Sequence, residues 1–366
     1  MSRMPPSKSK APAPARPPGR VTLGDIAREL GVTKAAVSLA LRNQRVSQAL
    51  RAKVQAKVRE MGYRPDPMLN ALAFYRRANV KQAITTELAW INCWPDPKTL
   101  RSFKEFNLYW QGAYDEAEQA GYRLEEFHFN GALRPARLDQ ILTARNIRGI
   151  LLPPWHKFHP DWQDFPWQKY CAVRFGNSFK LPRVHIIGSD QLANGLMACE
   201  KISSLGYKSI GLVTGTLSHS RFAGGFLHHQ MRSHAEIQIN PLVLGQANRE
   251  EDKRTLAAWL AQYRPDALFT DIGPLRAMLT ELGVRVPRDL GLAVYSVLDG
   301  DADAGIFQNS DEIGRAAVRQ VISLIHHNDF GVPEVCNELL VEGRWVDGSS
   351  LPPQKKPGPP AKPPRG

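Results

Sequence analysis

The segment TKAAVSLALRN, residues 33–43, contains the residues best suited to binding a polyanion. Lys34 and Arg42 flank a run of small and apolar residues that carries one hydroxyl, Ser38. On a helix, such cations can bond to phosphates or to guanine, and apolar side chains can contact thymine methyl groups. The same composition is also typical of a helix that belongs to a hydrophobic core. Both interpretations depend on the elements around the segment.

Catalytic and metal-binding patterns are missing from the sequence. It has no GxxxxGK[ST], GxSxG or HExxH motif. The histidines at 156, 159, 228 and 229 have no clustered acidic or cysteine companions, so packing or surface roles are favoured over metal ligation. We therefore predict that the chain is not an enzyme and that it needs no cofactor and no metal.

Basic residues are concentrated at the N-terminal side and in both tails. The net charge is +13, and residues 21–82 alone carry twelve basic and four acidic residues. Residues 1–20 and 351–366 add further basic residues and no acidic ones, which leaves the long remainder slightly acidic. A basic module on a near-neutral body predicts a polyanionic partner for that module alone.

Several features predict a cytoplasmic protein with reduced thiols. The four cysteines are scattered, and no CxxC pair occurs. No apolar run reaches the roughly 18 residues of a membrane helix, and the N-terminus lacks the apolar stretch of a signal peptide. The Pro-, Ala- and Lys-rich ends, residues 1–19 and 349–366, are expected to be disordered. They either add nonspecific phosphate affinity or are solvated tails without a role.

Three short helices are predicted between residues 22 and 62. Thr22 and Asp25 have the spacing of a capping box. Gly31 permits a sharp turn, and Thr33 can cap a second helix that ends near Arg42. Helix, glycine turn and helix together indicate a helix-turn-helix. A third helix opens at Ser47 and is expected to bury Leu50, Val54, Val58 and Met61 before Gly62 ends it.

The order VTLGDIARELGVTKAAVSLALRN, RVSQALRAKV and GYRPDPMLNALA resembles the DNA-binding head of LacI/GalR transcription regulators. In that family the last segment is a hinge that becomes helical in the DNA minor groove. The family's wedging leucine matches Leu72. Asp66 can cap this helix and Pro67 suits its first turn, although Asp66 and Leu69 replace the usual Asn and Ala. The alternative is that Met68, Leu69 and Leu72 simply pack as a linker helix.

The resemblance also implies roles for the head residues. Lys34, Ala35 and Leu39 match the positions that meet base edges, and Thr33 and Ser38 better suit phosphate. The remaining DNA-contact candidates by family position are Thr22, Ala36, Arg42, Tyr63, Leu69 and Leu72. Val37, Ala40 and Leu41 are expected to point inward.

From about residue 85, apolar runs alternate with amphipathic segments. ELAWINCW, RLEEFHFN, GILLPPW, KYCAVRFG, RVHIIGSD, SIGLVTG, DALFTD and LGLAVYSV read as strands with helices between them. This alternation predicts a parallel, doubly wound α/β sheet with ligands at the carboxyl ends of its strands. The family resemblance extends through LLVEGRWVDGSS. It implies two Rossmann-like lobes of the periplasmic-binding-protein-like type, crossed about three times by the chain.

The family resemblance implies that a small ligand binds between the two lobes. Asp271 matches an Asp that often hydrogen-bonds a sugar hydroxyl, but it can also cap the next helix. Arg221 lies in a segment that resembles the family's Arg-x-x-Gly-aromatic motif. If Gly225 and Phe226 are instead the Gly-aromatic pair, the alignment moves by one residue and Phe222 takes the arginine position. Asp190 is favoured as a hinge or cap over a ligand contact. Gln308 matches a polar residue at the lobe crossing, and Trp94 and Trp155 either stack on a sugar ring or pack within a lobe.

The predicted domains are a tail (1–19), a helix-turn-helix domain (20–65), a hinge and linker (66–82), a two-lobed core (83–348) and a second tail (349–366). The predicted function is a homodimeric transcription regulator, favoured as a repressor. Its affinity for a near-palindromic DNA operator would be controlled by a small effector, most plausibly a carbohydrate. The alternatives are a regulator of the same fold without a small-molecule effector and a cytoplasmic sugar-binding protein.

Overall fold

The computed structural model describes residues 21–41, 46–63, 86–129, 133–155, 161–178, 181–215, 217, 221–233, 239–245 and 249–354. The chain divides into two compact units, Met1–Ala83 and Ile84–Gly366. The predicted hinge with Leu69 and Leu72, the residue Arg42 and both predicted tails to residue 19 and from residue 355 lie outside the described residues.

Within its described residues, the first unit, the head, has the helices α1 (Leu23–Glu29), α2 (Lys34–Leu41) and α3 (Gln48–Glu60). The predicted caps are confirmed. The backbone N–H and the hydroxyl of Thr22 both donate to Asp25, and Thr33 Oγ1 accepts from the Ala36 N–H at 3.1 Å. Ser47 Oγ accepts from the Leu50 N–H, which starts α3. Gly31 has φ +63°, so the turn between α1 and α2 uses the left-handed region that glycine adopts readily.

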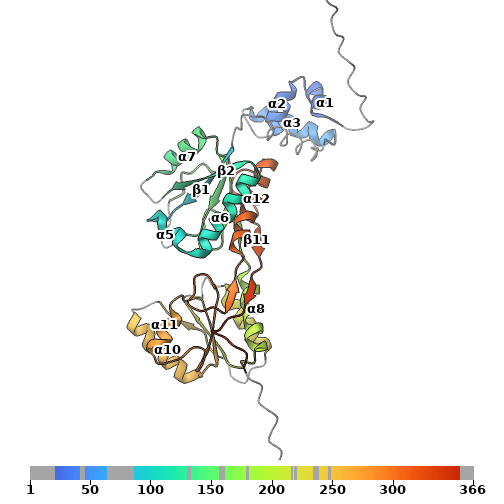
Figure 1. Cartoon of the computed structure of the whole chain (residues 1–366). Helices are drawn as coiled ribbons and strands as arrows, with labels where there is room; N and C mark the ends of the chain where they lie inside the picture. The colour runs from blue at the N-terminus through green and yellow to red at the C-terminus, as the bar shows by residue number, and fades with distance from the viewer. Residues whose placement is uncertain are drawn as a thin grey trace, which may run out of the picture. The chain divides into compact units, whose positions relative to one another are not determined.

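The second unit, the core, contains two six-stranded sheets, each in its own lobe (Figure 1). The strands of the first lobe are β1 (Thr86–Asn92), β2 (Tyr122–His128), β3 (Gly149–Leu152), β4 (Cys171–Phe175), β5 (His185–Ser189) and β11 (Glu338–Val341). Its helices are α5 (Pro97–Ser102), α6 (Lys104–Gln119), α7 (Pro135–Ala144), the short 3₁₀ turn η1 (Trp167–Lys169) and α12 (Ser310–His327).

The second lobe repeats this plan. Its strands are β6 (Ile210–Thr214), β7 (Leu242–Val243), β8 (Ala267–Thr270), β9 (Gly291–Val294), β10 (Gly305–Phe307) and β12 (Arg344–Val346). Its helices are α8 (Gln191–Ser204), α9 (Arg221–Arg232), α10 (Arg249–Tyr263) and α11 (Leu275–Glu281).

Both sheets have the same strand order. The first runs β2-β1-β3-β4-β5-β11 and the second β7-β6-β8-β9-β10-β12, and every pair is parallel except the antiparallel pair of β10 and β12. The chain crosses between the lobes three times, from β5 to α8, from β10 to α12 and from β11 to β12. The predicted α/β core of two Rossmann-like lobes is therefore confirmed.

Helices cover both faces of each sheet, which explains why the strands are apolar on both sides. In the first lobe α6 and α12 pack on one face and α7 on the other; in the second lobe α8 and α9 lie opposite α10 and α11. All four cysteines are free thiols, as predicted. Among the described residues, no helix has the length and apolar character needed to cross a membrane.

Helices α6 and α12 cross in very close contact. A Cβ atom added at Gly112 would lie 1.9 Å from the Asp311 carbonyl oxygen, and one added at Gly314 would lie 2.1 Å from the Tyr109 carbonyl oxygen. Both clashes are with backbone, which cannot rotate away. The two glycines therefore fix how the middle of α6 lies against the N-terminal part of α12.

Gly314→Ala is expected to destabilise the core by about 1–3 kcal/mol, the typical cost of overpacking. The matched control is Gly224→Ala in α9, where the nearest atom to the added Cβ is the end of the Leu192 side chain at 3.1 Å. Urea unfolding measures both. Equal stability of Gly314→Ala and wild type would contradict the tight crossing.

Candidate functional site

The second helix of the head has a buried face and an outer face. Val37 and Ala40 are fully buried and pack with Ile26, Ala27 and Val54. Leu41 is half-buried against the same cluster, so the predicted inward face is confirmed. The segment TKAAVSLALRN thus contributes to a core with one side only.

The remaining positions of α2 face outward or are partly covered. Lys34 is exposed, while Ala36, Ser38 and Leu39 are half-buried. Ala35 lies in the first turn of this helix, between Lys34 and Ala36. Tyr63, after α3, packs against the head core. Thr22 and Thr33 use their side chains as caps, so any contact with DNA phosphate would be additional to that role.

In the core, Asp271 lies where doubly wound sheets bind ligands. Strands β6 and β8 flank the point at which the strand order of the second sheet reverses. Asp271 follows β8, and its Oδ1 accepts from the Gly215 N–H after β6 at 3.0 Å. It does not cap the next helix, because α11 begins after Pro274 without a side-chain cap. The capping alternative for Asp271 is therefore wrong.

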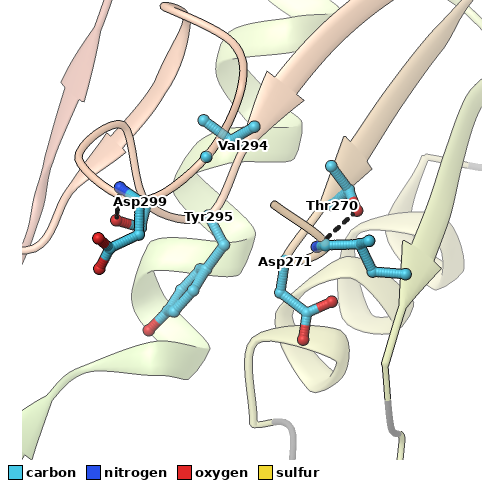
Figure 2. A pocket seen from close by; sticks show the side chains of 8 residues that line it. Thr270, Asp271, Val294, Tyr295 and Asp299 are labelled. Carbon is cyan, nitrogen blue, oxygen red and sulfur yellow. Dashed lines mark hydrogen bonds between the residues drawn. The ribbon is translucent and has the colours of Figure 1, made fainter. Parts of the chain in front are cut away.

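A small cavity adjoins Asp271 at the ends of β8 and β9 (Figure 2). Its volume is about 60 Å³, whereas pockets for small organic ligands typically have ~300–1,000 Å³. Tyr295 lies between Asp271 and Asp299 in this view. The cavity is lined by Thr270, Asp271, Ile272, Val294, Tyr295, Ser296, Asp299 and Gly300.

The surrounding protein changes the pKa of two polar groups that line the cavity. Asp271 is exposed to solvent, yet desolvation by the surrounding protein raises the pKa of its carboxyl group, partly offset by the Gly215 and Thr214 hydrogen bonds. Burial also raises the pKa of Tyr295, whose hydroxyl lies 3.3 Å from Ser189 Oγ of the first lobe. Tyr295 stacks on Phe222 with a centroid separation of 4.6 Å.

A carboxylate of the second lobe caps a helix of the first. Phe103 occupies the N-cap position of α6 and has no side-chain oxygen to offer. Asp299 takes over this role: its Oδ1 accepts from the Lys104 N–H at 2.8 Å and its Oδ2 from the Glu105 N–H at 3.2 Å. A carboxylate at a helix N-terminus satisfies free N–H groups and interacts favourably with the helix dipole.

Glu105 makes the reciprocal contact from the first lobe. Its side chain is 4% exposed. Ser296 of the second lobe donates to Oε1 at 2.5 Å, and Ser310 at the start of α12 donates to Oε2. The Ser296 hydroxyl also accepts from the Asp299 N–H at 3.1 Å. We call Glu105, Ser296, Asp299 and Ser310 the interlobe cluster.

Burial raises the pKa of Glu105, and the nearby Asp299 charge acts in the same direction. The hydrogen bonds from Ser296 and Ser310 lower the pKa and offset part of this effect. The charged form of Glu105 is thus held by two hydroxyl donors in a place that disfavours charge.

The other predicted effector residues have structural partners. Trp94 is buried, and its Nε1 donates to the Pro154 carbonyl at 2.7 Å. Trp155 is buried and stacks on Trp162. Both therefore pack within the first lobe, which was the predicted alternative to stacking on a sugar ring. The Trp94 bond joins the segments that follow β1 and β3, at the strand-reversal point of that lobe.

Asp190 caps α8 by accepting from the Ala193 N–H at 3.1 Å, which agrees with the favoured capping role. Arg221 begins α9 and forms a two-pronged ion pair with Glu338 of β11, with N–O distances of 2.6 and 3.1 Å. This pair is another contact between the lobes. Gln308 is buried between β10 and α12, at a lobe crossing, as predicted.

Glu105 lies 191 residues before Ser296 in the sequence, and the sequence analysis did not identify any of the four members of the interlobe cluster. The signal available was the acidic run LDGDADAG after the strand LGLAVYSV, together with an apolar residue at the start of α6. Among the described residues, no group of histidines, cysteines and carboxylates has the geometry to hold a metal ion.

The raised pKa of Glu105 predicts a pH-dependent stability. A carboxyl whose pKa is higher in the folded state contributes stability below its unfolded pKa of about 4.3 and loses it as pH rises through the folded pKa. As pH rises from about 4 to about 7, the melting temperature of the wild type should therefore fall relative to that of Glu105→Gln.

The control for this measurement is Asp289→Asn. The hydrogen bond from Arg285 lowers the pKa of Asp289 to about 2, so its contribution is present above the unfolded pKa of about 3.9 and is lost as pH falls below that value. Its melting difference from wild type should stay constant over the same pH range. A flat profile for Glu105→Gln as well would contradict the raised pKa.

The comparisons with known proteins agree with this architecture. Residues 22–66, the head and the first residues after it, match the model of "Bacterial regulatory proteins, lacI family". The transcriptional repressor CytR of Escherichia coli (strain K12) is 26% identical over 347 residues, covering 88% of this chain and 95% of CytR. The curated relatives are transcriptional regulators rather than enzymes.

Two solved structures share the fold. The transcriptional regulator CelR–cellobiose complex superposes with a TM-score of 0.56 at 18% identity, covering 90% of this chain and 100% of CelR. The lac repressor dimer bound to operator and the anti-inducer ONPF gives 0.52 at 17% identity, covering 91% and 100%. The head thus matches the lacI family model, nearly the whole chain is similar to CytR, and the two-lobed core has the fold of CelR and the lac repressor.

Proposed function

We propose that the protein is a sequence-specific DNA-binding transcription regulator and that it acts as a repressor. The observation that carries this proposal is the head, in which α2 buries Val37 and Ala40 and keeps Lys34 exposed. A helix held in this way can enter the major groove. The lac repressor, which shares the fold, was solved as a dimer on its operator. We propose the same assembly here, a homodimer on a near-palindromic operator.

The proposed contacts divide by chemistry. Lys34 bonds to guanine, Ala35 and Leu39 offer only apolar contacts, and Thr33 and Ser38 meet phosphates. Leu72 is proposed as the wedge in the minor groove, so that DNA deformability supplies much of the specificity. The further proposed contacts are Thr22, Ala36, Arg42, Tyr63 and Leu69.

The proposed effector is a small molecule, most plausibly a sugar or sugar derivative, bound at the cavity beside Asp271. Support comes from the position of Asp271 at the strand-reversal point and from the exposed carboxylate it presents there. CelR, with the same fold, was solved with cellobiose. Arg221, Asp190 and Gln308 stay proposed contributors at the lobe crossings, whereas Trp94 and Trp155 would need to leave their packed positions.

A second candidate is a regulator of the same fold without a small-molecule effector. The observation in its favour is the cavity of about 60 Å³ together with the interlobe cluster that borders it. Thermal melts across a broad panel of neutral and acidic sugars separate the two candidates, because a ligand that binds only the folded state raises the melting temperature. No shift with any sugar would favour the second candidate.

Footprinting on the DNA upstream of the protein's own gene tests the regulator proposal. We expect a protected near-palindrome at moderate salt and a steep loss of affinity as salt rises. No protected site at moderate salt would contradict the proposal.

Lys34→Ala is expected to relax the base preference at one or two positions of the selected site, at a cost of about 1–3 kcal/mol per lost base contact. The matched control is Lys53→Ala, which removes an exposed cation from α3. It should weaken binding to all sequences about equally or not at all. Selection of binding sites from a random DNA pool measures both. An unchanged preference in Lys34→Ala would refute this assignment of the outer face of α2.

A further inference from the structure

Helices α8 and α9 of the second lobe expose a group of large apolar side chains. Leu192 of α8 is 54% exposed, and Leu227 and Met231 of α9 are 42% and 74% exposed. Leu227 and Met231 are four residues apart and therefore lie on one side of α9. A Cβ atom built at Gly224 would lie 3.1 Å from the end of the Leu192 side chain, so Leu192 borders Gly224. We call Leu192, Gly224, Leu227 and Met231 the α8/α9 patch.

The patch has a rigid base, because α8 and α9 run side by side in the same direction. At their starts the Arg221 N–H donates to Gln191 Oε1 at 3.2 Å, and further along the Ser203 hydroxyl lies 3.1 Å from His229 Nε2. Between these contacts the two backbones approach closely, since a Cβ atom built at Gly225 would lie 2.4 Å from a carbonyl oxygen of α8.

The patch has the composition of a protein contact surface. The opposite side of α9 supplies Phe222 and Phe226 to the core of the lobe, so the patch is not needed for that core. Exposed charged residues flank it: Glu200 and Lys201 on α8, and Arg232 directly after Met231. Contiguous apolar surface with a polar edge marks an interaction site.

The shape of the patch matches a second copy of itself. Met231 projects from α9, whereas Gly224, about two turns earlier, has no side chain, so the helix backbone itself forms the surface there. When two α9 helices pack antiparallel about a two-fold axis, Met231 of each copy lies against Gly224 of the other, and the two Leu227 side chains meet near the axis. An unbranched Met side chain adapts well to such a contact.

The same arrangement matches the charges. Because α8 runs parallel to α9 within each copy, antiparallel α9 helices also bring the two α8 helices together antiparallel. Glu200 and Lys201 are level with the middle of the patch, between the contacts of α8 with Gly225 and with His229. Glu200 of each copy then lies beside Lys201 of the other copy. Charge complementarity of this kind favours a second copy as the occupant.

From these features we propose that the α8/α9 patch is a self-association surface, at which a second copy of this chain docks with its own α8/α9 patch. The contact needs neither DNA nor an effector. It adds to the proposed homodimer, because each homodimer carries the patch twice and joins further dimers in pairs or in chains. Two dimers joined in this way would hold two operator sites close together.

Sedimentation equilibrium of the full chain without DNA tests this surface. Wild type is expected to form an assembly larger than a dimer as its concentration rises. Leu227→Asp and Met231→Asp should each weaken this step at least about tenfold, because each places a carboxylate against an apolar surface. The matched control is Val335→Asp in the first lobe, where the side chain is 72% exposed, and it should associate as wild type does.

An exchange of charges distinguishes a second copy from an unrelated partner. Glu200→Lys alone and Lys201→Glu alone should each weaken the association severalfold, because each places like charges together. The double variant exchanges both charges in both copies and should restore the association. Circular dichroism confirms that each variant is folded. A wild type that never exceeds a dimer, equal association of all variants, or no recovery in the double variant would overturn the proposal.

Discussion

The core depends on hydrogen bonds that two carboxylates, one from each lobe, accept from the other lobe. Asp299 of the second lobe satisfies the first N–H groups of α6, and Glu105 on that helix accepts from Ser296 of the second lobe. The first lobe has no substitute for these contacts: α6 starts at Phe103, which cannot cap it, and Glu105 is buried, with Ser310 as its partner within the lobe. The first lobe thus leaves two polar requirements that the second lobe meets, and buried polar groups without partners are costly.

The two lobes share one topology but differ at the place where ligands bind in such sheets. In the first lobe the buried Trp94 donates to the Pro154 carbonyl between the ends of β1 and β3. In the second lobe the equivalent position, between β6 and β8, is spanned by Asp271 and Gly215 and borders a cavity. Repetition of the fold therefore does not repeat the binding chemistry.

Local signals in the sequence were sufficient for most of the fold. The caps at Thr22, Thr33 and Ser47 act within four residues. The inner strands, such as β3, β4, β8 and β9, are recognisable because both sheet faces are covered there, so that these strands are buried along their whole length. The position of Asp271 at a strand end followed from the same pattern. The division into two lobes and the three crossings came from the family resemblance rather than from any local rule.

The residues that pair over long distances could not be predicted in this way. Glu105 and Asp299 are separated by 194 residues, and nothing in either neighbourhood specifies the other. The two tryptophans illustrate a different limit: a Trp at a strand end suits a sugar or a lobe interior equally well, and only the surrounding side chains decide. The ion pair of Arg221 with Glu338 likewise depends on the return of β11 to the first sheet.

The cap that α6 borrows from the other lobe has a thermodynamic consequence. When the lobes separate, the first turn of α6 loses the partner of its N–H groups and can fray, so that Lys104 and its neighbours regain conformational entropy. Separation then exchanges hydrogen-bond enthalpy for chain disorder. Because the weight of the entropic gain grows with temperature, warming favours the separated lobes, and the borrowed cap makes the balance between the two arrangements sensitive to heat.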